Sequence, residues 1–111
     1  GFQDFTNYCK YYFSKDDDIT ENLKKNRYLK VVSDNDVEEI KSYFENFIDW
    51  VQFQKYKDKY DFSAECIDTS DYFYIENKYA CAENYTDKYS DYNVYFFDVQ
   101  TMTLYFIHSN I

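Results

Sequence analysis

Residues 94–108, with the sequence VYFFDVQTMTLYFIH, decide the fold of this chain. Apolar side chains fill both alternating sets of positions on either side of residues 99–102, which predicts two antiparallel strands, Val94–Asp98 and Thr103–His108, joined by a turn. Because both faces of this hairpin are apolar, we expect one to lie against a long helix, and the other to meet the N-terminal helix, a curled sheet or a second copy of the chain. With Phe97 opposite Leu104, one face carries Tyr95, Phe97, Leu104 and Phe106, and the other carries Val94, Phe96, Tyr105 and Ile107.

The long helix is predicted over residues of about 34–56. Ser33, Asp34 and Asn35 are suitable capping residues, and the acids that follow favour the positive end of a helix. Apolar residues then recur at helical spacing, which predicts one face packed on the core. That stripe consists of Val37, Ile40, Phe44, Phe47 and Val51.

Two shorter helices are predicted before the long one. Residues 18–21, Asp-Ile-Thr-Glu, have the spacing of a capping box and predict a brief helix through about Lys25. Residues 28–32 are predicted to be extended or to form an irregular approach to the long helix. An earlier amphipathic helix is predicted from five residues on one helical stripe: Phe5, Tyr8, Cys9, Tyr12 and Phe13.

After Lys57 the apolar period changes to two, which is typical of strands. Residues 60–66 and 72–79 predict a first hairpin, and residues 82–93 predict a long loop before the second one. The sequence therefore predicts a single α+β domain over 1–111, with N-terminal helices and the long helix packed on a four-stranded antiparallel meander.

The charge balance excludes several classes of partner. The chain has 21 Asp and Glu against 12 Lys and Arg, a net charge of −9. This disfavours binding to nucleic-acid phosphates and docking on an anionic membrane, so we expect no nucleic-acid partner and membrane association only through an anchor upstream of Gly1. That glycine is the only one in the chain, which excludes glycine-rich phosphate-binding loops, and we expect no cofactor.

Cysteine and histidine offer little chemistry. Cys9, Cys66 and Cys81 lack the C-x-x-C spacing of zinc sites and redox pairs; a Cys66–Cys81 bridge and three buried thiols both remain open. His108, the only histidine, would need a carboxylate to act as a general base, and the register places Asp98 at the opposite end of the hairpin. We therefore predict no catalytic or metal-binding residue.

The predicted loop is the first choice for a contact surface. Its tyrosines are regularly spaced among small polar and acidic residues, a composition typical of binding loops. A chain with 15 tyrosines also places some in loops without any function. The candidate contact residues are Tyr85, Tyr89, Asp91 and Tyr92.

Three segments carry a family resemblance: residues 32–47 (VSDNDVEEIKSYFENF), 71–75 (DYFYI) and 95–108. They resemble uncharacterised small extracytoplasmic domains of low-GC Gram-positive bacteria, which are usually tethered by an N-terminal membrane segment. A long helix followed by four antiparallel strands is also similar to cystatin-like and nuclear-transport-factor-like architectures. Cystatins inhibit cysteine proteases through a glycine near the N-terminus and a Gln-Val-x-x-Gly hairpin; this chain has no glycine after position 1 and no such hairpin motif.

The leading hypothesis is a non-enzymatic extracytoplasmic domain, secreted or membrane-anchored, that binds a protein or cell-envelope ligand or is structural. Gly1 resembles the scar of tag removal, so we expect a signal peptide or anchor upstream. A homodimer through residues 94–107 is a further possibility. The alternatives are an intracellular acidic inhibitor, such as an immunity protein or nucleic-acid mimic, and a small hydrolase or isomerase with a pocket in the concavity of the sheet.

Overall fold

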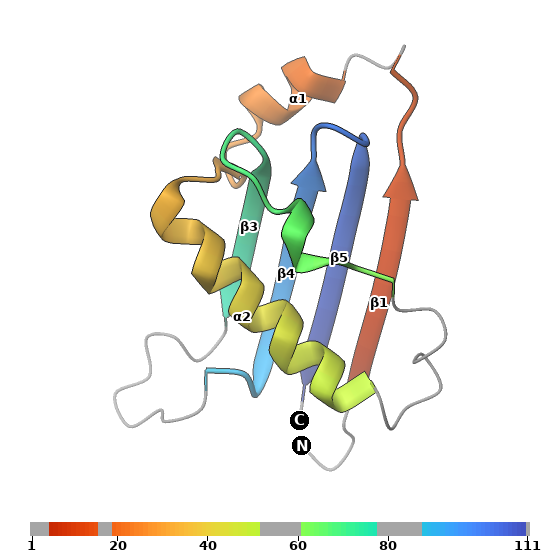
Figure 1. The fold of residues 1–111 in the computed structure, drawn as a ribbon, viewed down its shortest axis with the longest axis vertical. Helices are drawn as coiled ribbons and strands as arrows, with labels where there is room; N and C mark the ends of the chain where they lie inside the picture. Colours follow the sequence, from red (N-terminus) through yellow and green to blue (C-terminus); the bar gives the residue numbers. More distant parts are fainter. Residues whose placement is uncertain (1–4, 16–18, 52–60, 78–87, 111) are drawn as a thin grey trace.

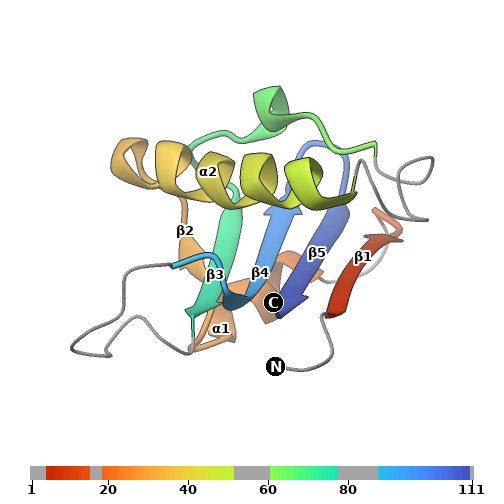
Figure 2. The same cartoon turned by 90° about the horizontal axis from the view of Figure 1, so that it is seen from below.

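An antiparallel sheet of five strands forms the centre of the molecule, with a long helix across one face and a short helix against the other (Figure 1, Figure 2). The computed structural model describes residues 5–15, 19–51, 61–77 and 88–110. The α+β class is confirmed, whereas the prediction of four strands is wrong, because the sheet has the order β1-β5-β4-β3-β2. In chain order the elements are β1 (Phe5–Tyr12), α1 (Ile19–Lys25), β2 (Lys30–Val31), α2 (Asp34–Val51), the 3₁₀ helix η2 (Ala64–Cys66), β3 (Tyr72–Asn77), β4 (Asp91–Asp98) and β5 (Thr103–Asn110).

The hairpin of β4 and β5 lies at the middle of the sheet. Phe97 pairs with Leu104, so the predicted register is confirmed. One face of the hairpin packs on α2, and we call the opposite face of the sheet the outer face. The side chains on the α2 face, Val94, Phe96 and Ile107, are fully buried.

The main core forms between α2 and the sheet. Ile40, Phe44 and Phe47 are at most 1 % exposed, as the predicted stripe requires. The cap is a variant of the capping box, in which the Ser33 amide and hydroxyl both donate to one oxygen of Asp36, at 3.0 and 2.7 Å. The predicted helix at 34–56 is confirmed as far as Val51, and residues 52–56 lie outside the described residues.

The prediction of a helix over residues 5–13 is wrong, because this segment is the edge strand β1. Its residues fit both periods, and pairing decides between them. All eight residues of β1 pair with β5. Without β1, the backbone N–H and C=O groups along the outer side of β5 would have no strand partner. Cys9, expected in the core, is exposed.

The predicted hairpin of residues 60–66 with 72–79 is also wrong. Residues 64–66 form η2, while β3 pairs with β4 and with β2. Phe62 explains the difference, since its ring stacks on Phe44 at 3.8 Å and meets Tyr105 edge-on at 4.8 Å. These contacts place the segment over the core beside α2, and the predicted extended segment at 28–32 supplies β2 as the neighbour of β3.

The outer face is covered in part by α1, as Figure 2 shows. This helix confirms the prediction from residues 18–21, and its Leu23 packs with Tyr72, Phe97 and Met102 in a second buried cluster. The remaining outer face carries side chains that are only half-buried, among them Tyr74, Tyr95 and Phe106.

Turns are built without glycine. The Asp98 carboxylate accepts from the Gln100 amide at 3.0 Å and from the Thr101 hydroxyl at 2.9 Å. Ser70 and Met102 adopt positive φ angles of 83° and 54°, a conformation that glycine usually supplies. Asp and Ser thus perform the turn chemistry for which most chains use glycine.

Candidate functional site

The predicted contact surface is not assembled by the structure. Asp91 and Tyr92 begin β4 and are 5 % and 0 % exposed, so the prediction that they lie in a loop is wrong. Tyr92 points toward α2, where its ring meets Tyr43 edge-on at 4.9 Å. The strand begins at Asp91 and not at the predicted Val94, because residues 91–93 pair with 108–110 of β5.

Tyr89 is half-buried beside the same tyrosine cluster, and Tyr85 lies outside the described residues. The Tyr89 ring meets Tyr43 edge-on at 5.3 Å. Lys88 ties this turn to α2 through an ion pair with Glu39 at 3.1 Å, and its ammonium lies 5.1 Å from the centre of the Tyr89 ring. In this arrangement Tyr89 packs the turn against α2.

His108 belongs to a hydrogen-bonded chain of three strands on the outer face. The Glu76 carboxylate can only accept, so the Asn93 amide group donates to it, at 2.8 Å. This orientation turns the Asn93 carbonyl toward His108, whose Nδ1 must donate across 2.7 Å. His108 is thereby linked to a carboxylate through Asn93.

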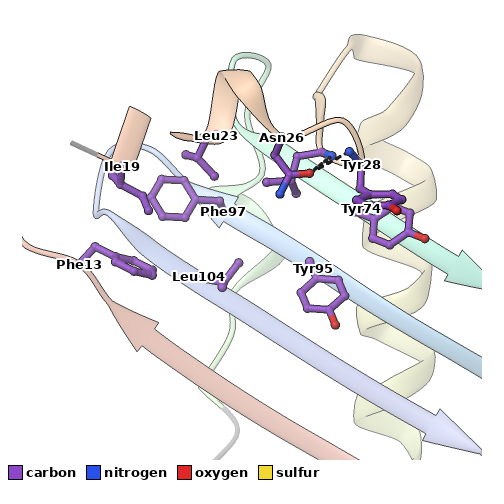
Figure 3. A pocket seen from close by; sticks show the side chains of 10 residues that line it. Phe13, Ile19, Leu23, Asn26, Tyr28, Tyr74, Tyr95, Phe97 and Leu104 are labelled. Carbon is purple, nitrogen blue, oxygen red and sulfur yellow. Dashed lines mark hydrogen bonds between the residues drawn. The ribbon is translucent and has the colours of Figure 1, made fainter. Parts of the chain in front are cut away.

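An apolar pocket opens on the outer face beneath α1 (Figure 3). Its volume is about 330 Å³. Figure 3 shows Ile19 and Leu23 on the helix side of the pocket and Phe97 and Leu104 on the strand side. Asn26 is the one lining residue without an apolar or aromatic side chain.

Local sequence explains how the pocket forms. Ile19 and Leu23 are four residues apart, so both project from one side of α1 onto the sheet. Asn26 then turns the chain, because its side-chain oxygen accepts from the backbone amides of Tyr28 at 2.8 Å and Leu29 at 3.2 Å. The turn brings Tyr28 and Leu29 to the pocket wall.

A row of aromatic rings continues from the pocket across the outer face. Tyr28 lies 5.7 Å from Tyr74, Tyr74 stacks on Tyr95 at 6.0 Å, and Tyr95 lies 4.8 Å from Phe106. Tyr28 is 51 % exposed. Burial, together with the charge of Glu76 and a hydrogen bond to it, raises the pKa of Tyr74.

The charge beside this row differs from that of the whole chain. The Arg27 guanidinium donates to the Tyr28 hydroxyl at 2.7 Å and lies 4.8 Å from the centre of its ring. Residues 22–33 contain no Asp or Glu but hold four of the 12 Lys and Arg, namely Lys24, Lys25, Arg27 and Lys30. The pocket mouth is therefore locally basic on an acidic protein.

Thiol and metal chemistry find little support in the described part of the chain. Cys66 is a free thiol there, and Cys81 lies outside the described residues. Burial, with the nearby charges of Asp98 and Asp71, raises the pKa of Cys66 to about 12. Among residues 5–15, 19–51, 61–77 and 88–110, no cluster of three or more metal-ligating side chains is found.

Sequence reasoning missed the pocket, although two signals for it were present. The Ile19 and Leu23 spacing marks a helix with one apolar side, and the acid-free run at 22–33 marks a basic surface next to it. Within the described residues, no helix combines the length and apolar character needed to span a bilayer. Comparisons with protein-family models, with curated proteins and with solved structures find no match to this chain.

Proposed function

We propose that this chain is a non-enzymatic binding domain whose pocket beneath α1, together with the aromatic row beside it, takes up an apolar group of a protein or cell-envelope ligand. The observation that carries the proposal is the pocket itself, an apolar hollow of about 330 Å³ on the outer face. This volume falls at the lower end of the range for ligand sites, which is about 300–1,000 Å³.

The half-buried rings support binding by this face. Tyrosine and phenylalanine are enriched at the centres of interfaces because they bury a large apolar area at low cost in conformational entropy. Tyr28, Tyr74, Tyr95 and Phe106 form a continuous surface of this kind. A bound ligand would cover the apolar area that α1 leaves accessible to solvent.

Location and architecture are part of the same proposal. An extracytoplasmic domain, secreted or anchored, would meet cell-envelope ligands directly. A cystatin-like arrangement is favoured by the long helix α2 lying across an antiparallel sheet (Figure 1). In the proposed arrangement, β1 is an additional strand at the edge of the sheet, beside β5.

The test uses a neutral apolar probe, N-phenyl-1-naphthylamine, whose fluorescence rises on leaving water. Leu104→Trp places an indole in the pocket, and Tyr12→Trp adds the same group at a side chain that is 68 % exposed and does not line it. Excluding about 100 Å² of apolar probe surface should weaken binding by tenfold or more in Leu104→Trp. Tyr12→Trp should bind the probe as the wild type does.

Two results would contradict the proposal. The first is no binding by the wild type, and the second is equal binding by both variants while circular dichroism shows them folded. If Leu104→Trp does not fold, Leu104→Phe replaces it. Sedimentation of the protein alone shows whether a second copy already occupies the outer face; a dimer that excludes the probe would also contradict the proposal.

A further inference from the structure

We infer that the ligand of this pocket is an amphipathic anion, a small molecule whose apolar body enters the pocket while its acidic group pairs with Arg27. The inference rests on the proposed function and adds the chemical class of the ligand. It follows from the charges and hydrogen-bond donors at the pocket mouth.

Arg27 is held where such a group would emerge. Its guanidinium is tied to the hydroxyl and lies against the ring of Tyr28, and Tyr28 lines the pocket. A guanidinium presents five N–H donors in a planar fork, so one contact with Tyr28 leaves donors for a carboxylate, sulfonate or phosphate. Arg27 is the only arginine of the chain.

The other polar groups at the pocket also favour an acceptor on the ligand. The oxygen of Asn26 is engaged by the Tyr28 and Leu29 amides, which leaves its NH₂ group to donate. The hydroxyl of Tyr95 can donate as well. A ligand with a negatively charged, acceptor-rich end therefore matches this surface better than a neutral or cationic one.

Nearby carboxylates already have partners. Glu21 on α1 lies 3.8 Å from the Lys24 ammonium, and Glu76 accepts from Asn93 and from Tyr74. Lys25 and Lys30, both exposed, add positive charge to the same segment. Residues 22–33 thus carry only positive charges beside Arg27, and such charges act over roughly one Debye length, about 8–10 Å at physiological salt.

A small anion fits better than a polyanion. The net charge of −9 repels nucleic acid and anionic bilayers, which approach a large part of the protein surface. A single acidic group at the pocket mouth is close only to the positive charges of residues 22–33, because salt screens the more distant acids. The geometry therefore points to a monomeric amphiphile in solution.

The experiment compares two probes with one skeleton. N-phenyl-1-naphthylamine is neutral, and 1-anilinonaphthalene-8-sulfonate carries one sulfonate on the same anilinonaphthalene framework. Loss of one charge-assisted contact should make Arg27→Gln bind the sulfonate about tenfold more weakly, with little change for the neutral probe. Lys41→Gln, on α2 and beside Glu45, is the matched control and should change neither affinity.

The outcomes separate the two proposals. If the neutral probe does not bind, the proposed function fails. If the neutral probe binds but Arg27→Gln and Lys41→Gln change the affinity for the sulfonate probe equally, only the inference of an amphipathic anion is overturned. Arg27→Lys keeps the positive charge but loses the planar fork of donors, so it should bind the sulfonate probe with intermediate affinity. Added salt should weaken binding of the sulfonate probe and leave binding of the neutral probe unchanged.

Discussion

Replacing Asp71 with alanine tests how a chain without internal glycine fixes its turns. Asp71 is 2 % exposed and joins three parts of the fold. Its carboxylate accepts from the Val99 amide at 3.0 Å and from the Asp68 amide at 2.9 Å, and its backbone carbonyl accepts from Val32 at 2.8 Å. Alanine keeps the backbone contact and removes both side-chain contacts.

The magnitude follows from those two amides. A buried donor left without a partner costs about 1–3 kcal/mol. Removing a carboxylate that is buried near Asp98 offsets part of this loss, so we expect Asp71→Ala to lower the free energy of unfolding by about 2 kcal/mol. The midpoint of thermal unfolding should fall by about 8 °C in a domain of this size.

Asp71→Asn removes the titratable group of this side chain. Burial is the main cause that raises the pKa of Asp71, so the folded protein holds this proton more tightly than the unfolded chain. Stability from this group is full below the unfolded pKa, about 3.9, and is lost as the pH rises through the folded pKa. Asparagine stays neutral, but its single side-chain oxygen can accept from only one of the two amides and its NH₂ group faces the other, so Asp71→Asn should also lower the free energy of unfolding at pH 7.

Urea unfolding followed by circular dichroism, at pH 7 and at pH 5, measures these differences. The wild type should gain stability relative to Asp71→Asn as the pH falls. The reasoning is refuted if Asp71→Ala stays within about 0.5 kcal/mol of the wild type, the usual range of neutral surface changes. It is also refuted if Asp71→Asn, which keeps at most one of the two side-chain contacts, is as stable as the wild type at pH 7.

Three further predictions concern single side chains. Ser70→Gly should stabilise the protein by about 0.5–1 kcal/mol in urea unfolding, because glycine adopts the positive φ without strain, whereas Ser70→Ala should bring no gain. Asp36→Ala should lower the free energy of unfolding by about 1 kcal/mol near neutral pH, because it removes the cap of α2. The Ser33 amide and hydroxyl lower the pKa of Asp36 in the folded protein, so the difference between wild type and variant should vanish as the pH falls through this lowered pKa. Peptide mapping after iodoacetamide treatment should find exposed Cys9 labelled in the folded protein and Cys66, whose pKa burial raises to about 12, labelled only after unfolding; equal labelling would contradict the placement of Cys66.

The sequence predicts those elements whose pattern has a single interpretation. The hairpin at 94–108 is apolar at every second position on both faces, and only a central position in a sheet suits it. Residues 34–51 combine caps, acids and a helical stripe, and all three signals agree. These two elements fix the main core.

The errors fall where one pattern fits two structures. Tyr8, Cys9 and Tyr12 fit a helical stripe, yet Tyr8 and Tyr12 also alternate with Cys9 and Tyr11 as a strand requires. The choice depends on the unpaired edge of β5, which is about a hundred residues away in the sequence and leaves no local signal. For residues 60–66, the stack of Phe62 on Phe44 is likewise a tertiary contact.

The candidate site was hidden for a similar reason. Its walls come from α1, the turn at Asn26, and β3 to β5, so no short motif contains it. The prediction favoured tyrosines in a polar segment, but Tyr92 is buried against α2, while the half-buried rings lie within strands that read as core. Alternation identifies which residues share a face but does not tell how much of that face a short helix covers.

The central claim, that the pocket beneath α1 binds an apolar group, is tested most directly by locating the bound probe. Methyl-resolved NMR with N-phenyl-1-naphthylamine measures nuclear Overhauser effects between probe protons and individual side chains. We predict contacts to the methyl groups of Ile19, Leu23, Leu29 and Leu104, which line the pocket, and none to Ile40 and Ile107 in the core beneath α2. Contacts confined to other residues, or no contacts at saturating probe, would contradict the account.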